Sequence, residues 1–461
     1  MNRTLAVLSL AVLLAAAPPA RAGSAADPLR KQIADATQHD NAQGANVLCG
    51  ALGQAVGSVR QFFKNRHACR EWEELLAEAQ ASVGRMRSPE AEKVFVMALR
   101  GMDPMAQMVV ALGLKEHPAS SDVDQAAIQL LKSTRDFQVQ VACMELLGAH
   151  KCADGLEEIL KQLKPTNIVA LQIASSRALA QIGDPRAVEP LIEYLRELKG
   201  SRMRFEAVAA LRAITGQNFT QDAGTWAGWW EKNKATFTKP NTIAPVFNYE
   251  LEQKSGPAEE EVTYYEIPIV ENRVVFIVDI SGSMQLGGDP NRLERAKTQL
   301  KDLVERLGDK TLFNIILYSN AVKRWMNNPV LVPASAANKK LAKDFLDEAR
   351  PGGGTETTWA LEEALREVSL VNGVETVFLL SDGAPQPMRH SNVTSIAQLP
   401  KGNTDIRKRI EFINQTLKVR INTIGVYTRA PGDPAEQGAD SMKAFLEGIA
   451  KDNDGVYKEV N

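Results

Sequence analysis

The stretch Arg273-Val-Val-Phe-Ile-Val-Asp-Ile-Ser-Gly-Ser-Met284 decides the fold of the carboxyl-terminal part of this chain. Residues 274–278 form an unbroken apolar run, rich in β-branched side chains, which is typical of a strand buried on both faces. The run ends at the carboxylate of Asp279, and hydroxyls follow at Ser281 and Ser283. Ligands of open α/β sheets bind at such carboxyl ends of strands. One carboxylate and two hydroxyls form an all-oxygen set, which favours a hard cation such as Mg²⁺.

Two later stretches extend this oxygen set. The glycine-rich segment 351–358 presents the hydroxyl of Thr355 just before a predicted helix. A second apolar run, residues 376–380, leads through Ser381 to the carboxylate of Asp382 and a turn glycine. Because parallel strands end along one edge of a sheet, we expect the three loops to meet in space.

The ordered motifs Asp279-x-Ser281-x-Ser283, Gly-Gly-Thr355 and Ser-Asp382-Gly resemble the metal-ion-dependent adhesion site of a von Willebrand factor A (VWA) domain. The resemblance implies that these five residues hold Mg²⁺, with Mn²⁺ or Ca²⁺ as alternatives, and that Asp279 acts directly or through water. Hydroxyls are neutral, so two carboxylates at most offset the ion, and an Asp or Glu of another protein can complete its coordination.

The same residues also allow plainer interpretations. Asp279 can cap the turn that follows it, and Asp382-Gly383 is a common turn pair. A metal held there can also be purely structural, with no exchangeable partner. Glu356, beside Thr355, is predicted to be a charge at the start of a helix, and it is a further candidate for contact with a partner.

From Thr263 onward, strand and helix patterns alternate, which predicts an α/β, doubly wound, mostly parallel sheet of the Rossmann-like kind over residues 263–461. Strands are expected at 263–268, 274–278, 311–318, 376–380, 419–426 and 456–460. Helices are expected at 292–307, 339–349, 359–368, 405–416 and 440–449. The resemblance to a VWA domain covers about 270–461.

Upstream, apolar residues recur at helical spacing with a period of roughly thirty-odd residues, which indicates stacked helical hairpins. The repeated pattern is Val139, Ala142, Cys143, Leu146 and then Leu171, Ala174, Ser175, Ala178. The unit 178–192 resembles a short HEAT-like repeat, in which Asp184 suits the helix N-cap and Pro185 the first helical position. We therefore expect an all-α, HEAT-like region over residues 88–236, closed by a cap of Trp226, Trp229 and Trp230.

The remaining segments indicate where the domains of the chain begin and end. Residues 1–22 have a positive start, an apolar core and an Ala-x-Ala cleavage site at Ala20 to Ala22, as in a secretory signal peptide. The apolar core is shorter than the ~20 residues of a membrane span, so no stable membrane anchor is expected. Residues 23–87 are predicted to be a helical N-terminal region, and residues 237–262 a linker rich in Pro, Gly and Glu. The protein is expected to be exported, either to a periplasm or outside the cell.

Composition and cysteine placement bear on which partners and which disulfides are expected. A net charge of −2 over 461 residues gives no reason to expect a nucleic-acid partner. In an exported chain, Cys49 with Cys69 and Cys143 with Cys152 is one of three conceivable disulfide pairings. The alternative is that Cys143, which lies on an apolar helical stripe, packs as a small hydrophobic residue.

These features together predict an exported adhesion or scaffold protein that is not an enzyme. Its VWA domain would bind an acidic residue of a protein ligand through the metal, and its repeats would form a second interaction surface. One alternative is a metal-dependent hydrolase or phosphoesterase with Asp279 or Ser281 as nucleophile, although the three loops contain no His or Lys base. Another is a VWA subunit of a chelatase- or ATPase-type complex, although the chain has no GxxxxGK[ST] loop.

Overall fold

The structure is a computed structural model that describes residues 25–62, 66–166, 168–198, 202–238, 262–327, 329–370, 373–383, 403–426 and 439–460. The predicted signal peptide lies outside these residues, as does nearly all of the predicted linker. The chain divides into two compact units between Phe95 and Val96. Across the described ranges, no helix combines the length and the apolar character needed to cross a membrane.

The first unit is helical. It contains α1 (Asp27–Thr37), α2 (Ala42–Phe62), α3 (Arg66–Arg85) and the start of α4 (Pro89–Gly101). Helices α1, α2 and α3 contact one another, and each contributes an apolar face, with Leu29, Leu48 and Leu75 all buried. The unit is therefore held together by an apolar core of its own.

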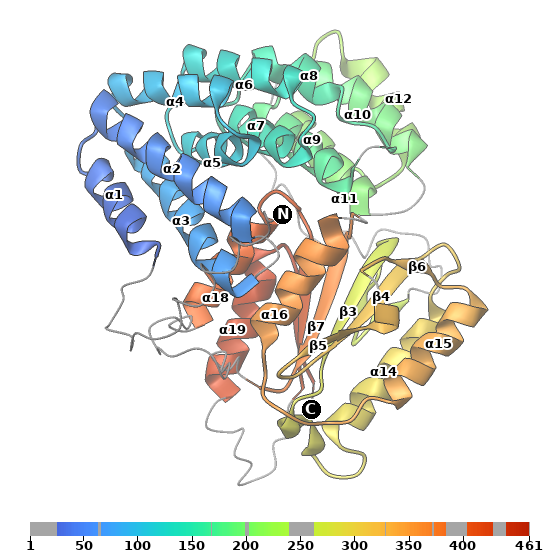
Figure 1. Ribbon diagram of the computed structural model, residues 1–461. Coiled ribbons are helices and arrows are strands. Elements are labelled where there is room, and N and C mark those ends of the chain that lie inside the picture. Colours follow the sequence, from blue (N-terminus) through green and yellow to red (C-terminus); the bar gives the residue numbers. More distant parts are fainter. Residues whose placement is uncertain are drawn as a thin grey trace, which may run out of the picture. The chain divides into compact units, whose positions relative to one another are not determined.

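The second unit begins with stacked helical hairpins (Figure 1). Their helices are α5 (Pro104–Leu114), α6 (Ser121–Ser133), α7 (Phe137–Ala149), α8 (Leu156–Leu160), α9 (Val169–Ile182), α10 (Val188–Glu197), α11 (Arg202–Thr215) and α12 (Ala223–Asn233). Helices α5, α7, α9 and α11 contact in turn and form one layer, while α6 contacts α8 and α10 contacts α12 in the other. This stacking confirms the predicted HEAT-like repeats.

The turn between α9 and α10 shows how the sequence directs a repeat. Gly183 ends α9 in the left-handed conformation, with φ 65°. The Asp184 side chain then accepts a hydrogen bond from the Arg186 amide, and Pro185 opens a 3-10 turn that leads into α10. The last helix, α12, buries Trp226 and Trp230, and the Trp226 indole donates to the Thr220 carbonyl at 2.8 Å. The indole rings of Trp226 and Trp230 are therefore packed inside the protein.

Of the two interpretations of the cysteines, the structure supports packing rather than disulfide pairing. Within the described residues no disulfide joins any of the four cysteines. Cys143 is fully buried in α7, and this burial raises the pKa of its thiol to about 12. The pairing of Cys143 with Cys152 considered from the sequence is therefore not formed, because Cys143 packs in the apolar layer instead.

In the ranges that the structure describes, the second unit continues into a seven-stranded sheet in the order β5-β4-β3-β7-β8-β9, with β6 also paired to β4. The strands are β3 (Arg273–Asp279), β4 (Leu312–Tyr318), β5 (Val322–Arg324), β6 (Val332–Pro333), β7 (Thr376–Ser381), β8 (Arg420–Val426) and β9 (Tyr457–Val460). Strands β4, β3, β7, β8 and β9 are parallel, whereas β5 and β6 run antiparallel to β4. The predicted mostly parallel sheet is confirmed.

Helices cover both faces of this sheet (Figure 1). Helices α14 (Arg292–Arg306) and α15 (Ala336–Asp347) lie on one face, and α16 (Thr357–Glu362), α18 (Asn403–Asn414) and α19 (Ala439–Asp452) on the other. Within β3, Val274, Phe276 and Val278 join the first core, while Val275 and Ile277 join the second. The unbroken apolar run of β3 thus fills two cores at once.

Two strand predictions differ from the structure. Residues 263–268 form a hairpin of β1 (Thr263–Tyr264) and β2 (Ile267–Pro268) rather than one strand. The chain reverses there because Tyr265 and Glu266 both take positive φ, at 49° and 64°, as in a two-residue hairpin turn. The short edge strands β5 and β6 were not predicted, since two or three residues give no measurable alternation of apolar and polar residues.

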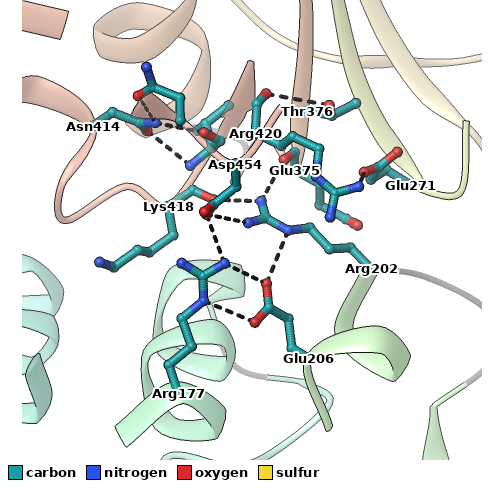
Figure 2. A network of polar contacts seen from close by, with 12 residues as sticks. Arg177, Arg202, Glu206, Glu271, Glu375, Thr376, Asn414, Lys418, Arg420 and Asp454 are labelled. Carbon is teal, nitrogen blue, oxygen red and sulfur yellow. Dashed lines mark hydrogen bonds and ion pairs between the residues drawn. The ribbon is translucent and has the colours of Figure 1, made fainter. Parts of the chain in front are cut away.

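The repeats meet the amino-terminal end of the sheet through a polar network (Figure 2). The guanidinium of Arg202, on α11, donates to the main-chain carbonyls of Glu375 at 3.1 Å and Lys418 at 2.6 Å, just before β7 and β8. Arg177, on α9, donates to Asp454 at 2.8 Å. We call the following residues the interface network: Arg177, Arg202, Glu206, Glu375, Lys418 and Asp454.

Candidate metal-binding site

The candidate site lies where the strand order of the sheet reverses. After β3 the chain moves to β4 on one side of β3, and after β7 it moves outward through β8 and β9 on the other side. The loops that leave β3 and β7 therefore diverge, and they form the kind of crevice in which open α/β sheets bind ligands. Both loops carry predicted site residues, because β3 ends at Asp279 and Asp382 follows the last residue of β7.

Asp279 is fully buried and held by hydrogen bonds on both carboxylate oxygens. Its Oδ1 accepts from the Ser281 amide at 2.7 Å. Its Oδ2 accepts from the hydroxyls of Ser381 at 2.7 Å and Tyr318 at 3.3 Å. These donors come from three neighbouring strand ends, so they fix the direction in which the carboxylate points.

Hydroxyl groups link Asp279 to the second carboxylate. The Oγ atoms of Ser281 and Ser283 lie 3.0 Å apart. The Ser283 hydroxyl donates to Asp382 Oδ1 at 2.7 Å, and Arg292 Nη1 donates to Asp382 Oδ2 at 3.0 Å. Four of the five predicted ligands thus belong to one hydrogen-bonded cluster that also includes an arginine.

The fifth predicted ligand, Thr355, reaches the cluster on the glycine-rich loop. This loop is tied to the β3 loop by two hydrogen bonds, from the Gly282 amide to the Gly353 carbonyl at 3.0 Å and from the Gly352 amide to the Ile280 carbonyl at 2.8 Å. A Cβ built at Gly383 would lie 3.4 Å from Thr355 Oγ1 and 3.7 Å from Ser283 Oγ. Because residue 383 is a glycine, no side chain of that residue occupies the space beside the hydroxyls of Thr355 and Ser283.

Glu356 follows Thr355 at the start of a helix. It is the N-cap residue of α16, its side chain is buried, and its amide donates to the Ser319 carbonyl at 3.0 Å. This placement agrees with the predicted helix-start position. The contact of Glu356 with a partner stays a prediction.

Burial and mutual repulsion shape the electrostatics of the two carboxylates. Burial, reinforced by the charge of Asp382, raises the pKa of Asp279 to about 7. Burial also raises the pKa of Asp382, although its hydrogen bonds with Ser283 and Arg292 oppose the rise. A positive charge placed between the two carboxylates would relieve both effects.

Three residues of the cluster were not assigned a role from the sequence: Arg292, Tyr318 and Ser381. Ser381 stood inside the Ser-Asp-Gly motif, so its position was known but its bond to Asp279 was not. Tyr318 ends β4 in register with Asp279 at the end of β3, which only the pairing of the strands reveals. Arg292 opens α14 and had no sequence signal beyond its place in the helix.

The chemistry of this donor set fits a divalent cation of the hard type. The donors are three hydroxyls and two carboxylates, and Mg²⁺ prefers oxygen ligands of this kind. In the described parts of the chain, no group of three or more His, Cys, Asp or Glu side chains could hold a metal. A cation at the candidate site would therefore depend on its hydroxyl ligands.

Comparisons with known proteins agree with this architecture. Residues 274–461 match the family model of the von Willebrand factor type A domain, and residues 124–212 match that of HEAT repeats. The chain carries a VWA domain. The match begins at the second residue of β3 and continues past β9, so the candidate site lies inside the VWA domain.

Curated relatives share part of the chain. It is 30% identical to the inter-alpha-trypsin inhibitor heavy chain H4 of Bos taurus, over 71% of this chain and 35% of the relative. It is 27% identical to the H4 chain of Homo sapiens, over 41% of this chain and 18% of the relative. The chain thus spans about a third or less of the length of these relatives. Among solved structures, it is similar to a von Willebrand factor type A protein from Catenulispora acidiphila, with 18% identity, coverage of 42% and 40% of the two chains, and a TM-score of 0.32.

Proposed function

We propose that the VWA domain binds an acidic residue of a protein partner through a divalent cation. The observation that carries this proposal is the buried cluster in which Asp279 and Asp382, with raised pKa values, are joined by serine hydroxyls at the switch point of the sheet. Two carboxylates held close together in a buried site suit a cation, and the surrounding hydroxyls supply neutral oxygen ligands.

The residues that would hold the ion are Asp279, Ser281, Ser283, Thr355 and Asp382, with Mg²⁺ as the first choice and Mn²⁺ or Ca²⁺ as alternatives. A bound ion supplies positive charge to which a carboxylate of a partner can coordinate. The chain's own residues prepare the site: Ser381 and Tyr318 orient Asp279, and Arg292 orients Asp382.

A binding role is favoured over catalysis. The three motif stretches, residues 279–283, 353–355 and 381–383, contain no His or Lys that could serve as a general base beside Asp279 or Ser281. The similarity to heavy chains of a trypsin inhibitor, which are named as parts of an inhibitor protein, also supports a protein partner. A hydrolase that uses the same cluster is the competing proposal, and Mg²⁺-dependent turnover of phosphate or ester substrates that is lost in Ser281→Ala would favour it.

Export and a second interaction surface belong to the same proposal. We infer from residues 1–22 that the protein acts in a periplasm or outside the cell. The repeats would offer a second surface on their other layer, formed by α6, α8, α10 and α12. The layer of α9 and α11 is already engaged with the VWA domain through the interface network.

The deciding experiment compares Asp279→Asn with Asp289→Asn. Asp289 is an exposed acid of the same loop, so its substitution controls for the loss of one negative charge. We expect the wild type and Asp289→Asn to bind Mn²⁺ in a titration and to capture a partner from the exported fraction with Mg²⁺ but not with EDTA. Asp279→Asn should do neither while keeping its circular dichroism spectrum. Partner capture by Asp279→Asn equal to that of the wild type would exclude the metal from the mechanism.

A further inference from the structure

Arg292 occupies a position that is unfavourable for an arginine. It is the first residue of α14, and its side chain is only 1% exposed. Burial penalises its charge, and the positive end of the helix dipole lies in the same turn. The position is nevertheless well fixed, because Asn291 caps the helix and the Arg292 amide donates to the Leu286 carbonyl at 3.0 Å. The ion pair with Asp382, at 3.0 Å, offsets the cost.

This ion pair changes the charge of the cluster. Asp279 and Asp382 contribute two negative charges, and Arg292 returns one positive charge, so this group of three side chains has a net charge of −1 when both acids are ionised. A divalent cation added to it gives a net charge of +1. Without Arg292 the same loaded cluster would be neutral, and its attraction for a carboxylate would be weaker.

Resting on the proposed function, we propose that Arg292 sets the ligand preference of the site: it holds Asp382 in place and, by opposing the cation, leaves the loaded site positively charged. The site then binds a bare divalent ion less tightly than its oxygen ligands alone would allow. An anionic ligand is attracted by the remaining positive charge and restores the binding free energy that the ion loses to Arg292. The ion and an acidic ligand therefore bind cooperatively, whereas neutral ligands are disfavoured.

The test separates charge from position by two substitutions. Arg292→Gln removes the charge but keeps an N–H group that can donate to Asp382, whereas Arg292→Lys keeps the charge. Mn²⁺ binding to the full chain is measured by electron paramagnetic resonance at about pH 8, above the raised pKa of Asp279. Circular dichroism in EDTA verifies that each variant is folded.

We expect Arg292→Gln to bind Mn²⁺ at least about tenfold more tightly than the wild type, and Arg292→Lys to stay within about threefold of it. Acetate, as a carboxylate probe, should tighten Mn²⁺ binding by the wild type and by Arg292→Lys more than by Arg292→Gln. A residue that only supports the fold would give the opposite result, namely weaker Mn²⁺ binding in Arg292→Gln.

The outcomes distinguish this inference from the proposed function. Mn²⁺ binding by the wild type that is lost in Asp279→Asn, combined with unchanged or weaker binding in Arg292→Gln, would overturn the role of Arg292 and leave the metal site standing. Absence of Mn²⁺ binding in both the wild type and Arg292→Gln would overturn both.

Discussion

Nη1 of Arg202 lies 2.6 Å from the main-chain carbonyl oxygen of Lys418, although Arg202 belongs to a repeat helix and Lys418 to the loop just before strand β8. The Arg202 side chain is completely buried, and it also reaches the carbonyl of Glu375. Buried main-chain carbonyls need hydrogen-bond donors. Arg202 provides one to Lys418 and adds a second to Glu375, whose carbonyl also accepts from the Arg420 amide at 3.0 Å. Arg202 thereby joins the repeats to the VWA domain through main-chain carbonyl groups, which are present whatever the residue types at positions 375 and 418.

Loss of Arg202 is expected to separate the unfolding of the two regions. Arg202→Met removes a donor from the carbonyls of Glu375 and Lys418 and removes the ion pairs with Glu206 and Asp454, so we expect a loss of about 3 kcal/mol in the free energy of unfolding. Urea unfolding followed by tryptophan fluorescence and circular dichroism should show two transitions in place of one. Arg196→Met, which removes an exposed pair with Glu193, should change stability by less than about 0.5 kcal/mol. A single, unshifted transition in Arg202→Met would contradict the assignment.

The ion pairs of Asp454 should appear in the acid unfolding of the protein. Burial opposes ionisation, but the charges of Arg177 and Arg202 outweigh it and lower the pKa of Asp454 to about 2. A lowered pKa stabilises the fold at pH values above the unfolded-state pKa of about 4 and loses this effect as the pH falls towards 2. Because the Asp454 side chain is still 43% exposed, solvent screens the pairs, and we expect a contribution of only about 1 kcal/mol.

Asp454→Asn tests this contribution without disturbing the backbone. Asp454 has a positive φ of 56°, which asparagine tolerates. The variant should be less stable than the wild type at pH 6, and the difference should vanish near pH 2. A difference that stays constant across this range in urea titrations would show that the charge of Asp454 plays no part.

Two glycines in helices should respond to alanine in opposite directions. A Cβ at Gly148, in α7, would lie 3.0 Å from Ala178 Cα on α9, so Gly148→Ala should push the two helices apart and cost about 1 to 2 kcal/mol. Gly57, in α2, has open space around its Cβ position, so Gly57→Ala should gain up to about 1 kcal/mol from helix propensity. Thermal unfolding of both variants compares them directly. Stabilisation by Gly148→Ala would refute the close approach of α7 and α9.

Removal of the Asp279 charge should stabilise the metal-free protein. The pKa of Asp279 is raised to about 7, so ionisation of its carboxylate destabilises the fold progressively as the pH rises from about 4 to about 7. Asp279→Asn should therefore gain about 2 kcal/mol at pH 8 in EDTA, after the loss of part of its hydrogen bonding. With Mg²⁺ the order should reverse, because only the wild type gains from the ion. Urea unfolding in both buffers measures this, and a variant less stable than the wild type in EDTA would contradict it.

Much of the VWA domain could be predicted from the sequence because its signals are local. The apolar run of β3 is long enough to mark a doubly buried strand, and the hydroxyl and acid residues directly follow the runs of β3 and β7. The meeting of the loops followed from the rule that parallel strands end at one edge. By contrast, Arg292 joins Asp382 across 90 residues, and no periodicity identifies such a pair.

The docking of the repeats was beyond sequence reasoning for the same reason. Arg202 and Lys418 are 216 residues apart, and each looks like an ordinary surface charge in its own segment. Their roles depend on main-chain groups, which carry no sequence signal. The hairpin at residues 263–268 was missed because positive φ at Tyr265 and Glu266 is unusual for these residue types.

The position of Arg202 has a mechanical consequence. It binds next to the first residue of β7, whereas Asp382 follows the last, so the repeats and the candidate site lie at opposite ends of a strand of six residues, about 20 Å long. Tension between a partner held at Asp382 and the anchored repeats would run lengthwise along β7. The ladders that join β7 to β3 and β8 would then be loaded in shear, with their hydrogen bonds sharing the force rather than opening one after another.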